Sequence, residues 1–185
     1  PSNFKSLILN NVQNGEIKAR LDINFDEFFK VKDYQVDGHV KNLITKITKE
    51  IKLENTDFIF SLNKNKGLFE SINGKINDIT FSQSKINFEI DKNIFLSASI
   101  KNTLNLDEKN SRKYAPIIPS FILSNKFNLN GNLTNELTLT LDKTFKIIDY
   151  NLKINGLIKD SFIDLSKPIQ NSILDKNIKK IFFNK

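Results

Sequence analysis

Apolar and polar residues alternate one by one along most of this 185-residue chain. In the stretch IKARLDINF, residues 17–25, every second residue is apolar. Successive side chains of a β-strand point to opposite faces, so this alternation predicts strands with one apolar and one polar face. The same pattern returns at 34–40, 58–62, 86–90, 94–100, 133–141 and 150–158. We therefore expect a mainly β protein with antiparallel strands that are wetted on one side.

Four of the six glycines interrupt this alternation without shifting its phase. They occur in KDYQVDGHVKNL (32–43), LFESINGKINDI (68–79), FNLNGNLTNEL (127–137) and YNLKINGLIKDSF (150–162). A two-residue turn at Asp37-Gly38 would place Val36 opposite His39, an apolar residue against a polar one. A continuous strand instead keeps Val36 and Val40 on one face. The sequence therefore predicts that the strands run through these glycines.

A glycine on the apolar face removes a side chain and permits a bulge or a bend. Gly38, Gly74, Gly131 and Gly156 are therefore candidate curvature positions. The predicted fold is a curved antiparallel sheet built from hairpins, forming an open groove or half-barrel with at most one short helix near the C-terminus. The alternative is close packing of the same glycines inside a β-sandwich core.

Turn signals divide the chain into hairpins. Asn14-Gly15 predicts a two-residue type I′ hairpin, since Val12 would then face Ile17. The polar stretches 63–67 and 106–113 predict loops, and the proline-containing stretch 114–124 predicts an irregular connector. DEFFK at 26–30 is compatible with one helical turn. Residues 168–183 fit either a helix or a short strand, and the pattern leaves both open.

Length and composition predict one β segment over residues 1–185, because no linker is visible. The chain has no methionine and starts at Pro1, so we expect a segment of a longer protein. Zero cysteines exclude disulfides and thiolate chemistry within these residues. The sequence has no run of about 18 apolar residues, so it predicts no membrane-spanning helix.

The net charge of +7 gives little support for nucleic-acid binding. Its lysines are scattered over outward strand positions, only two arginines occur, and no block of like charges appears. We therefore expect no nucleic-acid partner.

Catalytic and metal-binding patterns are missing from the sequence. His39 is the only histidine, and the strand phase points it outward, as is typical of a solvated residue. Adjacent carboxylates occur only at 26–27 and 107–108, in expected loops. Nucleotide-binding glycine motifs and calcium-loop spacing are absent. We expect a protein that is not an enzyme, with no metal and no cofactor.

The repeated arrangement of an apolar residue, Asn or Asp, Gly, any residue and an apolar residue, set in long alternating strands, resembles the AsmA-like family of bacterial envelope proteins. That family includes the TamB and YhdP types, and the resemblance is best over 32–105 and 125–165. It implies an elongated β-sheet with an apolar groove, anchored in the inner membrane of a Gram-negative bacterium by a segment not present here. Its implied role is to carry phospholipids across the periplasm to the outer membrane.

On this interpretation the inward apolar residues would line a groove for phospholipid acyl chains. The partners would be these lipids, neighbouring segments of the same chain, and inner- and outer-membrane components. A structural or adhesive β-sandwich with a closed dry core is the alternative for the same residues. The candidate lining residues are Val36, Val40, Ile72, Ile76, Phe88, Ile90, Leu96, Ile100, Leu129, Leu133, Leu139, Leu152, Ile154 and Ile158.

Overall fold

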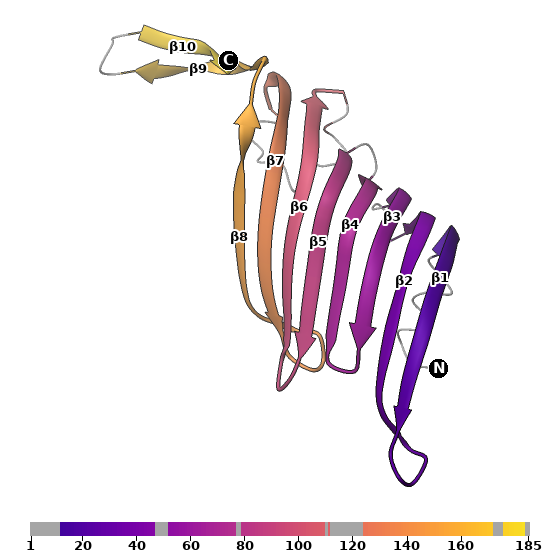
Figure 1. The fold of residues 1–185 in the computed structure, drawn as a ribbon. Coiled ribbons are helices and arrows are strands. Elements are labelled where there is room, and N and C mark those ends of the chain that lie inside the picture. The colour runs from indigo at the N-terminus through magenta and orange to yellow at the C-terminus, as the bar shows by residue number, and fades with distance from the viewer. Residues whose placement is uncertain are drawn as a thin grey trace. The chain divides into compact units, whose positions relative to one another are not determined.

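A computed structural model describes residues 12–46, 52–76, 79–109, 111, 124–171 and 176–183. Almost all of these residues lie in antiparallel β-strands, and no helix occurs among them (Figure 1). The strands are β1 (Val12–Phe25), β2 (Val31–Lys46), β3 (Lys52–Asn63), β4 (Lys66–Ile76), β5 (Ile79–Ile90), β6 (Ile94–Asp107), β7 (Lys126–Leu141), β8 (Ile147–Ile158), β9 (Ser161–Asn171) and β10 (Lys176–Phe183).

The strands pair in chain order from β1 to β7, followed by β9 and β10, while β8 also pairs with β7. Within the described ranges β1 and β10 do not pair with each other, so the sheet is open. The predicted fold class, a hairpin-built antiparallel sheet that is not closed, is confirmed.

Contacts divide the chain into two compact units. Unit 1 comprises Pro1–Asn102 and Thr134–Asn155, and unit 2 comprises Thr103–Leu133 and Gly156–Lys185. Strands β6, β7 and β8 each contribute residues to both units. That residues 1–185 form a single β segment stays a prediction.

In unit 1 the strand register keeps apolar residues on one face, which we call the apolar face. Val40 of β2 lies between Ile17 of β1 and Phe58 of β3, and Gly38 lies between Ala19 and Phe60. Apolar residues therefore meet apolar residues across three strands, as the alternation predicts. The chain continues through Gly38, Gly74, Gly131 and Gly156 inside β2, β4, β7 and β8, so the prediction of continuous strands is confirmed.

A row of β-bulges crosses strands β2 to β5. One residue in each strand has a positive φ of about 50°, and the register shifts beside it. An extra residue lets the strand bend while its side chains return to the same face, so the apolar spacing changes locally from two residues to three. Val40 and Leu43, for example, both lie on the apolar face. The bulge residues are Asn42, Asn55, Ser71 and Gln83.

None of the four strand glycines has a positive φ; among the described glycines only Gly15 does. Instead, Gly38, Gly131 and Gly156 lie where a neighbouring backbone approaches closely, whereas the atom nearest to a Cβ at Gly74 is the Thr56 hydroxyl oxygen. A Cβ at Gly38 would overlap the carbonyl oxygen of Lys18 on β1, and a Cβ at Gly131 would overlap that of Leu157 on β8. Glycine is thus required for close strand approach, while polar residues adopt the left-handed conformation at the bulges. That these glycines set the curvature stays a prediction.

Two local turn predictions are wrong. Asn14-Gly15 is not a hairpin: it lies inside β1, where Asn14 pairs with Ile44 and Gly15 has a φ of 149°. Residues 26–30 are not a helical turn but the loop of the β1–β2 hairpin. In both cases the long pairing of β1 with β2 overrides the local preference, because a single turn contributes less than a full ladder of strand pairs.

The region 168–183, left open between helix and strand, contains the end of β9 and all of β10. The loop at 63–67 is shorter than predicted, since Asn63 ends β3 and Lys66 begins β4. Strand β6 runs to Asp107 and a turn follows it. Most of the predicted connector 114–124 lies outside the described residues.

Unit 2 has a small core of its own. Leu106, Phe127, Leu129 and Ile163 are buried there. The buried Ser161 hydroxyl donates to the carbonyl oxygen of Lys159 at 2.8 Å and accepts from the Asn130 amide at 2.7 Å, so its burial leaves no unsatisfied polar atom.

Candidate apolar groove

The apolar face of unit 1 contains a hollow of about 370 Å³, which we call the apolar hollow. Its lining residues come from β2 to β6 and are hydrocarbon side chains apart from two hydroxyl residues. They are Leu43, Leu53, Thr56, Phe58, Phe69, Ile72, Ile76, Phe81, Ser84, Ile86 and Ile100. This volume lies within the range of small-molecule sites, roughly 300–1,000 Å³.

The two hydroxyl groups of the lining are directed to the backbone. Thr56 Oγ1 donates to the carbonyl oxygen of Glu54 at 3.2 Å. Ser84 Oγ donates to the carbonyl oxygen of Ser82 at 3.3 Å and accepts from the Lys101 amide at 3.2 Å. Both residues are almost fully buried, so the hollow offers a ligand carbon surface rather than hydrogen-bonding groups.

A row of phenylalanines runs across the apolar face from β3 to β5. The ring centroids of Phe58 and Phe69 are 5.7 Å apart with an edge-to-face angle of 72°. Phe60 lies 6.3 Å from Phe58, and Phe88 lies 6.2 Å from Phe69. Such tilted contacts hold large flat side chains in place without closing the face over them.

Some of the predicted lining residues lie at this hollow. Ile72, Ile76 and Ile100 line the apolar hollow. Val36 and Val40 lie on the same face of β2, and Val40 lies next to its bulge. Three other predicted residues, Phe88, Leu96 and Leu139, border a separate hollow of unit 1.

The remaining predicted lining residues are not brought into the apolar hollow. Ile90 at the end of β5 is exposed, as are Leu152 and Ile154 on β8. Leu129, Leu133 and Ile158 belong to unit 2, together with Gly131 and Gly156. The period-two pattern identified apolar residues but not which of them share one hollow.

Sequence reasoning missed much of the actual lining: Leu43, Leu53, Phe58, Phe69, Phe81 and Ile86. A signal was present, because the apolar spacing changes from two to three beside each bulge. Phe69 and Ile72 flank Ser71, and Phe81 and Ser84 flank Gln83. A three-residue step that contains Asn, Ser or Gln within an alternating strand is the sequence trace of the bulge row.

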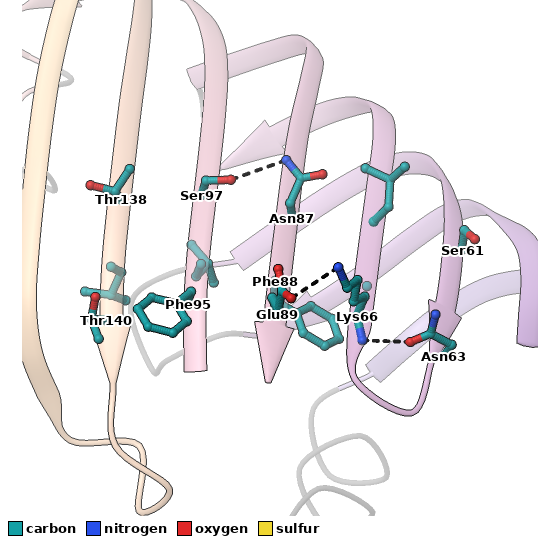
Figure 2. A pocket seen from close by; sticks show the side chains of 14 residues that line it. Ser61, Asn63, Lys66, Asn87, Phe88, Glu89, Phe95, Ser97, Thr138 and Thr140 are labelled. Atoms are coloured by element: carbon teal, nitrogen blue, oxygen red, sulfur yellow. Dashed lines mark hydrogen bonds and ion pairs between the residues drawn. The ribbon is translucent and has the colours of Figure 1, made fainter. Parts of the chain in front are cut away.

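The opposite face of unit 1 carries a hollow of about 510 Å³ bordered by both polar and apolar side chains. Figure 2 shows them along the ends of neighbouring strands, with Thr138 and Thr140 beside Phe95 and Ser97. Lys66 Nζ forms an ion pair with Glu89 at 3.1 Å, and Asn87 Nδ2 donates to Ser97 Oγ at 3.3 Å (Figure 2). Much of this polarity is thus paired within the protein, and the ion pair is exposed and weak.

Titratable groups do not form a catalytic set within the described residues. Hydrogen bonds from Ser61 and Gln35 lower the pKa of Asp37, and the Lys52 ammonium lowers the pKa of Glu54; both carboxylates are on the surface. His39 is half-buried opposite Ile59. No group of acidic or histidine side chains in the described part of the chain is placed to hold a metal ion.

No protein-family model matches the chain, no curated protein is detectably similar to it, and no solved structure matches it. Among the residues described, no helix has the length and apolarity needed to cross a bilayer.

Proposed function

We propose that the apolar face of unit 1 binds phospholipid acyl chains, as a segment of a bridge-like protein that carries lipids between the inner and outer membranes. The observation that supports this proposal is the open hydrocarbon hollow between β2 and β6, whose only two polar groups are satisfied by the backbone. Periplasmic localisation, inner-membrane anchoring by another segment and neighbouring segments that continue the groove belong to the same proposal.

The energetics of transfer support an acyl chain as the ligand. Removing one methylene from water is worth about 0.8 kcal/mol, so ten methylenes placed on this face would contribute about 8 kcal/mol. Such binding needs a continuous carbon surface and no catalytic residue. The lipid headgroup would stay in water at the rim of the sheet.

The closed β-sandwich requires a second layer over the apolar face. Within the described residues of unit 1, the strands form one layer. Large apolar side chains such as Ile17, Leu21 and Ile154 are more than half exposed. These observations support an open groove over the adhesive sandwich with a dry core.

Native mass spectrometry with lipid extraction tests the proposal on protein purified from bacteria without detergent. Ile100→Asp places a charge in the apolar hollow, and Ile59→Asp makes the same change at an exposed position of β3. We expect bound phospholipid in the wild type and in Ile59→Asp, and its loss in Ile100→Asp. Circular dichroism checks that the strand content is retained.

If Ile100→Asp does not fold, Ile76→Asn makes a milder polar change in the same hollow. A folded wild-type protein without lipid would contradict the proposal. Lipid retained equally by the hollow variant and its control would contradict it too.

A further inference from the structure

Two hairpin loops of unit 1, far apart in sequence, have the same structure. The β1–β2 loop has the sequence DEFFK (26–30), and the β7–β8 loop has the sequence DKTFK (142–146). In the first loop, the Asp26 amide donates to the carbonyl oxygen of Lys30 at 2.8 Å. Asp26 Oδ1 accepts from the amides of Phe28 and Lys30, both at 2.9 Å.

The second loop repeats these bonds position by position. The Asp142 amide donates to the carbonyl oxygen of Lys146 at 2.9 Å. Asp142 Oδ1 accepts from the amides of Thr144 at 2.8 Å and Lys146 at 3.0 Å. The aspartate therefore organises each loop from within, which accounts for the first residue of the shared motif Asp-x-x-Phe-Lys.

The phenylalanine of the motif is not explained by the loop itself. Phe29 and Phe145 have φ values of 58° and 65°, a left-handed conformation that is unfavourable for bulky residues. The other non-glycine residues with positive φ in the described ranges are Asn, Ser, Gln or Asp. This chain is rich in asparagine, yet both loops carry phenylalanine where asparagine would suit the backbone better.

Both rings point into solvent. Phe29 is 87% exposed and Phe145 is 73% exposed, and the neighbouring Phe28 is 71% exposed. They therefore contribute nothing to a core. An exposed, conformationally unfavourable aromatic residue that recurs at the same position of two loops indicates selection for contact with something outside the chain.

The two loops lie on the same side of the sheet in unit 1. This side is formed by the ends of the strands and the loops that join them, and we call it the loop edge. Strands β1, β3, β5 and β7 run in one direction, so the loops that follow them are at one edge (Figure 1). Five lysines lie in or beside these four loops, and none of them forms an ion pair with another described residue: Lys30, Lys64, Lys92, Lys143 and Lys146. The same loops hold four carboxylates, of which Asp26 and Asp142 accept hydrogen bonds from loop amides, so their net charge is small and positive.

We propose that this edge docks on an anionic phospholipid surface. Phe28, Phe29 and Phe145 insert at the boundary of headgroups and acyl chains, and the flanking lysines contact lipid phosphates. A fluid interface accommodates separate loop tips together, since lipids adjust laterally to each ring. This docking does not depend on lipid binding in the apolar hollow.

Vesicle co-sedimentation with equal parts of phosphatidylglycerol and phosphatidylcholine tests the docking. The double variant Phe29→Asn and Phe145→Asn removes both rings and suits the left-handed backbone. We expect its vesicle affinity to fall about tenfold or more, while its urea unfolding midpoint stays equal or rises. Phe182→Asn, at an exposed position of β10, is the matched control and should bind as the wild type does.

Tryptophan fluorescence gives a second measurement, because the chain contains no tryptophan. Phe145→Trp places a single reporter on the loop, and quenching by brominated lipids in the vesicles is expected. A wild-type protein that does not sediment with these vesicles would overturn the proposal, as would full binding by the double asparagine variant. Ile100→Asp should still bind vesicles, so failure of the groove and failure of the docking are distinguishable.

Discussion

The Asp57 carboxylate on β3 accepts a hydrogen bond from the backbone amide of Asn42 on β2, with an Oδ1–N distance of 2.7 Å. Asn42 is the bulge residue of its strand, so its amide is displaced from the regular ladder. The same device recurs between β4 and β5, where Asn73 Oδ1 accepts from the amide of the bulge residue Gln83 at 2.9 Å. Polar side chains on neighbouring strands thus satisfy the amides that the bulge row displaces.

Asp57→Ala removes this acceptor and leaves the Asn42 amide to water. We expect a loss of about 1 kcal/mol in the free energy of unfolding, since the site is exposed. Asp57→Asn keeps an acceptor oxygen and should lose less. Urea denaturation measures both variants, and equal losses would show that the hydrogen bond does not hold the bulge.

Gly38→Ala should destabilise the protein by about 1–3 kcal/mol, because the added Cβ would overlap the Lys18 carbonyl oxygen and displace a backbone. Gly67→Ala is the comparison, since there the Cβ meets the side-chain ends of Phe88 and Leu62 and not a backbone atom. Chemical denaturation should rank Gly38→Ala as the more damaging variant. The reverse order would contradict the assignment of close backbone approach.

The edge-to-face contact between Phe58 and Phe69 is expected to contribute beyond the area it buries. A double-mutant cycle with Phe58→Leu and Phe69→Leu should give a coupling energy of about 0.5–1.5 kcal/mol. Ile59→Val, on the opposite face of β3, provides a control cycle with Phe69→Leu. Coupling of similar size in the control would mean that the rings interact no more specifically than any residues in one strand pair.

The hydrogen bonds of the Asp142 carboxylate predict how the stability of the β7–β8 loop depends on pH. The hydrogen bond from the Thr144 hydroxyl, followed by that from the Lys146 amide, lowers the pKa of Asp142. A group whose pKa is depressed in the folded state stabilises that state fully above its unfolded pKa, about 3.9, and loses this contribution as the pH falls through the folded pKa. The ordered loop should therefore be retained at neutral pH and weaken in strong acid.

Thr144→Val removes the larger cause and should raise the pKa of Asp142 toward the ordinary value for aspartate. NMR titration of the Asp142 side-chain carboxyl carbon measures the shift. The Asp37 carboxyl, whose pKa is lowered by hydrogen bonds from Ser61 and Gln35, is an internal control, because Thr144→Val leaves its contacts unchanged. A pKa of Asp142 that does not move would show that the hydroxyl bond is absent in solution.

The β-strands and their continuity through the four glycines were predictable because they depend on local pattern. In Val36-Asp37-Gly38-His39-Val40 the alternation alone excludes a turn, since a turn would place polar residues on the apolar face. The loops at 26–30 and 142–146 were less accessible. Their aspartate-centred hydrogen bonds form only once the flanking strands are paired, so DEFFK by itself is ambiguous.

The sequence by itself determined which side chains share a face of each strand, because that depends only on the two-residue period of an extended backbone. The tertiary structure decided the register between strands. It placed Asn14 opposite Ile44 inside β1, against a strong local turn preference. It also aligned the bulges of four neighbouring strands, so that Leu43, Phe58, Phe69 and Ile100 line one hollow. Strand register is set by pairing between distant segments, which no local pattern encodes.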